Sequence, residues 1–275
     1  MIMNDHGPLI VQSDHTLMLE VEHPEYTACR DFLVGFAELV KSPEFIHTYR
    51  LSPLSLWNAA ALEIPLQEIF HGLERFSKYE IPANVLYNVR EWHGAYGKLI
   101  LEKQSPGRLL FTAQESYILE TILGDKSLQQ FWLGRLNGGL LVSEAQRGNL
   151  KHALVKAGYP VKDLCGYLQG ASIDISLRNR DLRENPFRLR DYQTDAVEAF
   201  YHAGRSTGGS GVVVLPCGSG KTIIGLGIIS RISNYTLIIT TNNVAVHQWK
   251  GELMDKTHIS SEDIGEFTGI DKSIR

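Results

Sequence analysis

A glycine-rich segment in the last quarter of the sequence constrains the fold of this chain more than any other feature. The segment Gly218-Ser219-Gly220-Lys221-Thr222 follows an apolar run at residues 211–215 and precedes a helical pattern that ends near Arg231. Glycines let backbone amides turn inward and approach a phosphate, and the N-terminus of the following helix adds partial positive charge. Strand, glycine turn and helix in this order predict a nucleotide-binding loop on a parallel α/β sheet.

The side chains of this loop have separate expected roles. The Lys221 ammonium would contact the β- and γ-phosphates, and the Thr222 hydroxyl would bind the Mg²⁺ that accompanies the nucleotide, so these two residues are the catalytic candidates. The alternative is an ordinary glycine-rich turn. Leu215 stands where the full pattern has its first glycine, which argues against a simple kinase or GTPase. The other cofactor-binding candidates of the loop are Cys217, Gly218, Ser219 and Gly220.

A second candidate nucleotide contact lies upstream. Gln193 ends the segment Leu189-Arg190-Asp191-Tyr192-Gln193, 28 residues before Lys221. A glutamine amide offers both a donor and an acceptor, which fits the edge of adenine. Arg190 and Gln193 therefore join the cofactor-binding candidates, and the expected cofactors are ATP and Mg²⁺. The alternative is a surface glutamine near the start of a helix.

Composition limits the kinds of partner that the chain can bind. Its net charge is −4, so a nucleic-acid contact would need a local patch. Residues 178–190 hold five arginines, for which a solvated linker and a phosphate-facing patch are both open interpretations. Three cysteines without metal-ligand spacing predict reduced thiols in a cytoplasmic protein. The sequence has no signal-peptide pattern and no apolar run near the roughly 18 residues that span a bilayer.

Two modules are expected before the glycine-rich segment. Residues 1–104 mix short strands with helical stripes, which predicts a helical, winged-helix-like module. One of its helices would begin after Pro24 and bury Leu39 and Val40. A turn at Ser105-Pro106-Gly107 marks the expected boundary.

Residues 105–185 are expected to form a small α+β module. Ser143 and Gln146 have the spacing of a capping box at the start of a helix. A final strand is predicted at residues 173–177. Residues 186–275 then alternate strands with helices, with apolar strands expected at 211–215 and 235–240 and a third beginning near 264.

Three motifs of this last segment together resemble the XPB branch of superfamily 2 helicases. They are Leu-Arg-Asp-Tyr-Gln193, Val-Leu-Pro-Cys-Gly-Ser-Gly-Lys-Thr222 and Val-His-Gln-Trp-Lys250. The upstream stretches Leu9-Ile-Val-Gln-Ser-Asp14 and Tyr49-Arg-Leu-Ser-Pro-Leu-Ser-Leu-Trp-Asn58 resemble the N-terminal module of microbial XPB-like proteins. The resemblance therefore covers nearly the whole chain.

The resemblance implies an ATP-dependent DNA helicase or translocase tied to DNA repair or promoter opening. Residues 105–185 would be a damage-recognition-like domain, and residues 186–275 the first part of a RecA-like lobe whose Q motif contains Gln193. The segment after residue 240 resembles motif Ia, in which Thr241, Asn242 and Gln248 would hold a DNA phosphate, while Trp249 would pack its helix on the sheet. The implied partners are ATP, DNA that is single-stranded or at a duplex junction, and a nuclease or other repair protein, with no membrane.

The sequence lacks one expected part of such an enzyme. It contains no Asp-Glu dipeptide, and 53 residues follow Thr222. A DEAH-type box would supply the Mg²⁺-binding aspartate and the glutamate that orients water. The sequence thus suggests a truncated or split enzyme that binds ATP weakly and hydrolyses it negligibly by itself, with a protease-sensitive region after about residue 188.

Two other functions remain open from the sequence. The chain could be a non-catalytic module that binds DNA or a protein, with a P-loop that is vestigial or completed by another chain. A P-loop kinase or other small-substrate NTPase is the weaker alternative, because Gln193, Thr241 and Gln248 argue against it.

Overall fold

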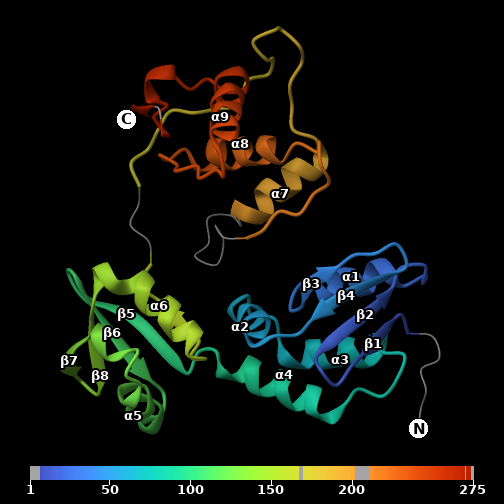
Figure 1. The fold of residues 1–275 in the computed structure, drawn as a ribbon, viewed down its shortest axis with the longest axis vertical. Coiled ribbons are helices and arrows are strands. Elements are labelled where there is room, and N and C mark those ends of the chain that lie inside the picture. Colours follow the sequence, from blue (N-terminus) through green and yellow to red (C-terminus); the bar gives the residue numbers. More distant parts are fainter. Residues whose placement is uncertain (1–6, 167–169, 202–210, 270, 274–275) are drawn as a thin grey trace. The chain divides into compact units, whose positions relative to one another are not determined.

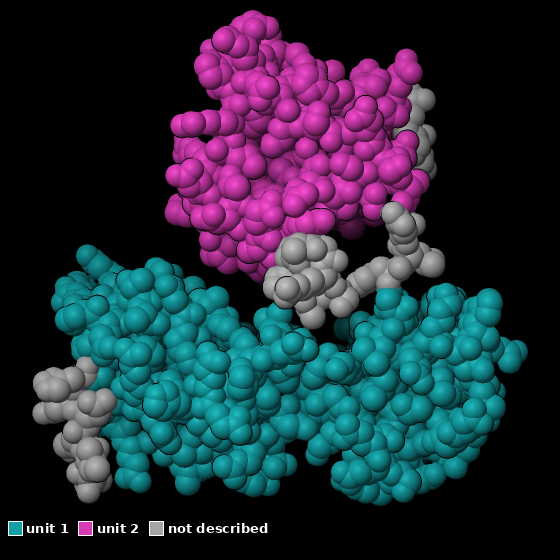
Figure 2. Space-filling view, turned by 180° about the vertical axis from the view of Figure 1, so that it is seen from behind, with its two compact units in different colours: residues 1–166 teal, residues 167–275 magenta. Residues whose placement is uncertain are grey.

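The chain folds into two compact units, residues 1–166 and 167–275, which Figures 1 and 2 show. The computed structural model describes residues 7–166, 170–201, 211–269 and 271–273. Among these residues, no helix is both long and apolar enough to cross a bilayer.

The first half of unit 1 packs helices against an antiparallel sheet of strand order β1-β2-β4-β3. Alternation along β2 turns Leu17 and Leu19 inward, where both are fully buried against helix residues such as Leu73. Helix α2 begins with a side-chain cap, since the Ser52 hydroxyl accepts the Ser55 amide at 3.1 Å. The elements are β1 Leu9–Val11, β2 Thr16–Glu20, α1 Tyr26–Leu33, β3 Glu38–Lys41, β4 Ile46–Arg50, α2 Pro53–Ala61, α3 Leu66–Phe76 and α4 Ala83–Ala95.

One predicted helix of this module is shorter than its apolar pattern. Helix α1 ends at Leu33, and Gly35, a poor helix former, follows it. Leu39 then pairs with Tyr49 as part of β3, at the edge of the sheet. Leu39 is 49% exposed and Val40 47%, so their predicted place on a buried helix face was wrong.

The second half of unit 1 is a five-stranded sheet of order β7-β8-β6-β5-β9 with its own core. The turn after Ser105 joins β5 to β6, and Ser105 faces Arg108 across the hairpin. The predicted boundary at Ser105 therefore moves to the residues between α4 and β5. The elements are β5 Leu99–Ser105, β6 Arg108–Ala113, α5 Ser116–Gly124, η1 Gln129–Phe131, β7 Trp132–Leu136, β8 Gly139–Ser143, η2 Glu144–Gln146, α6 Arg147–Lys156 and β9 Val161–Asp163.

The predicted capping box at Ser143 and Gln146 does not form. A short 3-10 turn, η2, precedes α6, and neither Ser143 nor Gln146 makes a side-chain cap. The Gln146 amide oxygen instead accepts a hydrogen bond from Asn149 at 2.9 Å. Glu144 accepts the Gly107 amide at 3.1 Å, which ties this turn to the β5–β6 hairpin. The Gln146 side chain therefore bonds forward to Asn149 of α6 and not back to the Ser143 backbone.

A buried carboxylate links α6 to β9. The Asp163 side chain is only 8% exposed and lies 2.8 Å from Arg147 Nε and 2.9 Å from Lys151 Nζ. It also accepts the backbone amide of Cys165 at 3.1 Å. Burial by itself raises the pKa of Asp163, but these donors outweigh burial and hold the pKa at about 2.

We expect Asp163→Asn to destabilise unit 1 by about 2 kcal/mol near neutral pH, because the folded-state pKa lies below the ordinary value of 3.8. This contribution is complete above pH 3.8 and disappears as the pH falls through about 2. Urea denaturation at neutral pH and near pH 2 measures it, with Glu102→Gln, an exposed change on β5, as the control. A loss of equal size at both pH values would contradict this account.

Unit 2 is built around helix α8. A Cβ on Gly227 would meet Val197 of α7, and a Cβ on Gly225 would collide with Trp249 of α9, so glycines let both neighbouring helices approach closely. Trp249 packs on α8 and not on a sheet, which corrects its predicted role. The elements are α7 Asp191–Tyr201, α8 Lys221–Ile232, α9 Asn243–Lys256, η4 Ser261–Asp263, β10 Glu266–Phe267 and β11 Lys272–Ser273.

The helices of this unit match the sequence prediction, but the parallel sheet does not form among the described residues. Residues 211–215 and 235–240 belong to no helix or strand, and Val212 is 89% exposed. The predicted strand at 173–177 makes only single bridges at its ends. The third predicted strand is β10, which pairs antiparallel with β11. A parallel strand is stable when both its faces are covered, and these segments lack that cover here.

Candidate nucleotide-binding site

The glycine loop stands directly before α8, as the sequence predicted. Gly218 and Gly220 have φ values of 78° and 80°, a left-handed backbone that favours glycine. The Ser219 hydroxyl donates to the Pro216 carbonyl at 2.6 Å, which closes the loop on itself. The amides of the first turn of α8 and the positive end of its dipole thus lie beside the loop.

Lys221 and Thr222 occupy the first turn of α8. The Lys221 Nζ atom donates to the carbonyls of Leu215 and Pro216, each at 2.9 Å, so the ammonium lies across the loop. Contact with a nucleotide phosphate would replace these two neutral acceptors by a charged one. The Thr222 hydroxyl has no hydrogen-bond partner among the described residues. One hydroxyl suits Mg²⁺, which takes most of its ligands from phosphates and water.

Gln193 lies against the loop from helix α7. Its side chain is buried, and its Oε1 atom accepts the Arg190 amide at 3.0 Å. Its Nε2 atom donates to the Ser219 carbonyl at 3.2 Å. A Cβ on Gly220 would lie 2.6 Å from that same nitrogen, so any larger residue would push the glutamine away. The structure therefore brings Gln193 and the loop together. Arg190 lies beside them, donating to the Tyr192 hydroxyl at 3.4 Å.

Tyr192 is a contact that the sequence analysis missed. Its hydroxyl donates to the Ser219 carbonyl at 2.7 Å, the same oxygen that Gln193 contacts. The neighbouring position in the Tyr-Gln pair was the only sequence signal for it, because a tyrosine at a helix start has no distinctive pattern.

The three candidate DNA contacts lie at the start of α9, and all three side chains are exposed. The Asn242 side chain accepts the Ala245 amide at 2.9 Å and so caps the helix. Its amide nitrogen lies 3.4 Å from the Thr241 hydroxyl. Gln248 follows on the next turns of the same helix. The structure places Thr241 and Asn242 directly before α9 and Gln248 within it, and their contact with DNA stays a prediction.

The arginine-rich stretch is fixed to the end of α9. Arg178 Nε donates to the Thr257 carbonyl at 2.7 Å, and the Leu182 amide donates to Asp255 at 3.0 Å. This segment is therefore hydrogen-bonded to α9 and the residue after it, which contradicts its interpretation as a freely solvated linker. Arg183 and Arg188 remain exposed, and the phosphate-facing interpretation stays a prediction.

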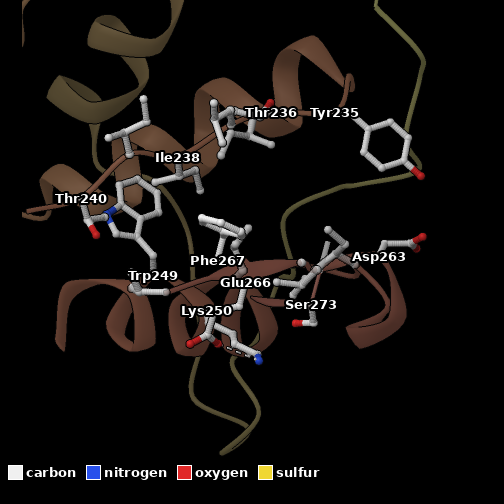
Figure 3. A pocket seen from close by; sticks show the side chains of 18 of the residues that line it. Tyr235, Thr236, Ile238, Thr240, Trp249, Lys250, Asp263, Glu266, Phe267 and Ser273 are labelled. Atoms are coloured by element: carbon white, nitrogen blue, oxygen red, sulfur yellow. Dashed lines mark hydrogen bonds and ion pairs between the residues drawn. The ribbon is translucent and has the colours of Figure 1, made fainter. Parts of the chain in front are cut away.

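A cavity of about 900 Å³ lies between α9 and the segments at 234–243 and 263–267 (Figure 3). Ile238, Trp249 and Phe267 line it, and Lys250 forms an ion pair with Glu266 at 3.1 Å, drawn as a dashed line in Figure 3. Residues 216–222 take no part in its lining, so it is separate from the glycine loop.

Comparison with known proteins gives a family for this arrangement. Residues 9–137 match the family described as helicase conserved C-terminal domain, and residues 186–275 match type III restriction enzyme, res subunit. A protein of Kineococcus radiotolerans named DNA 3'-5' helicase XPB is 42% identical over 270 residues, which is 98% of this chain and 47% of the relative. Over nearly its whole length, the chain is similar to the XPB-like helicases.

Other XPB-like helicases show how much of the family the chain covers. The protein of the same name from Mycobacterium tuberculosis is 40% identical over 98% of this chain and 47% of its own length. A protein of Enterocytozoon bieneusi, named general transcription and DNA repair factor IIH helicase/translocase subunit XPB, is 30% identical over 95% of this chain and 42% of its own length. The chain therefore spans about half the length of the curated relatives it matches.

Proposed function

We propose that this chain is the ATP-binding portion of an ATP-dependent DNA helicase or translocase of the XPB type that acts in DNA repair. The observation that carries the proposal is the glycine loop before α8 with Gln193 of α7 held against it at 3.2 Å. The identity to XPB-like helicases extends over 98% of the chain and so includes both parts of this site.

The loop residues would divide the work of binding ATP. The amides around Cys217, Gly218 and Gly220 would hold the phosphates, with the Lys221 ammonium on the β- and γ-phosphates. Thr222 would hold Mg²⁺, which would neutralise charge on the phosphates when bound.

Gln193 would select adenine with its side-chain amide. Its oxygen accepts one protein donor, Arg190 N. An amide oxygen has two lone pairs, and the amide nitrogen has two protons. Gln193 can therefore hold the loop and still offer one acceptor to the base, and its second amide proton, now 3.4 Å from the Tyr192 hydroxyl, would be donated to the base in exchange for that contact. Arg190 would stay beside this contact as part of the cofactor-binding set.

DNA would be held at the start of α9. Thr241 and Asn242 are exposed beside the first turn of α9, and Gln248 is exposed further along the same helix. Hydroxyl, amide and backbone N–H groups are common contacts to DNA phosphates and carry no sequence preference by themselves. Single-stranded DNA, or a junction with duplex, is the proposed ligand, and a nuclease or other repair protein the proposed partner.

The modules would have separate roles in this proposal. The sheet and helices up to α4 would be the winged-helix-like module, and the sheet from β5 to β9 the damage-recognition-like module. The residues from 186 onward would contribute to a RecA-like lobe.

ATP titration by calorimetry tests the proposal on the purified 275-residue chain. We expect binding that requires Mg²⁺ and is weaker for GTP than for ATP, because guanine has an acceptor, O6, where adenine has the N6 donor that the Gln193 oxygen would meet. Gln193→Ala should bring the two affinities together. Absence of any ATP binding at millimolar concentration, or equal binding of ATP and GTP by the unmodified chain, would refute the proposed site.

A further inference from the structure

The peptide plane between Ser219 and Gly220 can rotate with little resistance from the loop itself. Rotation of a peptide plane changes ψ of the residue before it and φ of the residue after it. Gly220 has no Cβ and tolerates either sign of φ, so this rotation meets little steric resistance. Gly218 gives similar freedom two residues earlier. Contacts from outside the loop are therefore needed to fix the orientation of this peptide.

In the structure, two hydrogen-bond donors of helix α7 fix this orientation. The Tyr192 hydroxyl lies 2.7 Å from the Ser219 carbonyl oxygen, and Gln193 Nε2 lies 3.2 Å from the same atom. The two side chains also contact each other, with Gln193 Nε2 at 3.4 Å from the Tyr192 hydroxyl. The tyrosine contact is the shorter one. Gln193 is buried, whereas Tyr192 is 37% exposed.

The direction of the C=O group of a peptide also fixes the direction of its N–H group. A trans peptide is planar, and its C=O and N–H point in opposite directions. With the Ser219 carbonyl held on the α7 side, the Gly220 N–H points away from α7. A rotated peptide would instead turn that carbonyl away from α7, to the side from which the loop offers its amides, and would remove an amide donor from phosphate.

We infer that Tyr192 is a positioning residue for phosphate binding, which acts by holding the Ser219–Gly220 peptide with its amide available to a nucleotide phosphate. The inference rests on the proposed function of the loop. Tyr192 touches neither base nor phosphate in this arrangement. Its hydroxyl therefore affects every ligand that carries the same phosphates, whatever its base.

The Tyr192→Phe change removes the hydroxyl and keeps the ring. We expect binding of ATP, GTP and inorganic tripolyphosphate to the 275-residue chain to weaken by a common factor of roughly three- to tenfold, the effect of one lost hydrogen bond. Tyr201→Phe is the matched control, because Tyr201 lies on the same helix, its hydroxyl has no partner among the described residues, and its ring packs on Arg231 at 4.2 Å. That control should bind all three ligands as the unmodified chain does.

Equal binding by the Tyr192→Phe chain and the unmodified chain would overturn the inference and leave the proposed function standing. A loss confined to ATP would also overturn it, because Tyr192 would then act on the base. If the unmodified chain binds neither ATP nor tripolyphosphate, the proposed function fails instead.

The amide resonance of Gly220 tests the same contact without any nucleotide. We expect it to move on Tyr192→Phe and to stay in place on Tyr201→Phe. If Tyr192→Phe prevents folding, the unmodified chain still gives an answer, since a hydroxyl proton bonded to the Ser219 carbonyl should exchange slowly with solvent. An unmoved Gly220 amide or a rapidly exchanging Tyr192 hydroxyl would overturn the inference.

Discussion

Replacement of Lys221 by alanine is expected to weaken ATP binding by this chain roughly 10- to 100-fold, which is what the loss of a charge-assisted contact to phosphate costs. In the structure the ammonium lies 2.9 Å from two loop carbonyls, so it is already inside the loop. The substitution removes that charge and leaves the two carbonyls facing the phosphate site. Calorimetric titration with ATP and Mg²⁺ measures the change.

The matched control is Lys126→Ala. Lys126 is exposed on unit 1, so the same charge is lost there at a residue that is not part of the glycine loop. A nonspecific effect of net charge on ATP binding would appear in both variants. Unchanged affinity of the Lys221→Ala chain, with the control also unchanged, would mean that the glycine loop does not bind the nucleotide phosphates.

Local chemistry made the helices and the glycine loop predictable. Gly218 and Gly220 stand where left-handed backbone is required, and Lys221 begins α8 as expected. Ser52 and Pro53 likewise mark the start of α2. Such signals depend only on a few neighbouring residues, so they can be recognised without knowing the rest of the fold.

Apart from the capping box at Ser143, the predictions that failed depended on distant partners. Residues 235–240 have a strand composition, yet Leu237 and Ile239 are both 85% exposed, because strand formation depends on neighbours that the local sequence does not specify. Leu39 fitted a helical period but pairs with β4 at a sheet edge. The hairpin that joins β5 to β6 was hidden for the same reason, since a Pro-Gly turn serves hairpins and module boundaries alike.

The candidate site shows the same division. Gln193 was predictable from a donor and acceptor pair at a fixed distance from the loop, and the structure brings it to Ser219. The role of Tyr192 depends on which carbonyl its hydroxyl meets, and only the folded chain shows that. Trp249 was predicted to pack on a sheet, but it packs on α8 at Gly225, where the missing Cβ leaves room for the indole ring. No short motif contains both residues, so the sequence could not predict this contact.

Replacement of Phe111 by alanine is expected to destabilise the second module of unit 1 by about 3–5 kcal/mol, the usual cost of emptying a buried aromatic position. Phe111 is fully buried on β6, and its ring centroid lies 5.3 Å from that of Trp132. Trp132 on β7 is therefore a fluorescent reporter of this core. Urea denaturation followed by tryptophan fluorescence and by circular dichroism measures the loss. Leu133→Ala, at a β7 side chain that is 61% exposed, should cost little and is the control.

The Phe111→Ala chain also tests whether the corrected boundary between α4 and β5 separates two cores. The buried residues before α4 ends and those from Leu99 onward form distinct clusters. If each cluster unfolds by itself, Phe111→Ala should lower the urea midpoint of the second core only. Leu73→Ala, a change in the first core, should lower the urea midpoint of the first core only. Equal shifts of a single transition by both variants would show that unit 1 unfolds as one cooperative body, because stability lost at one buried site would then be felt by the whole unit.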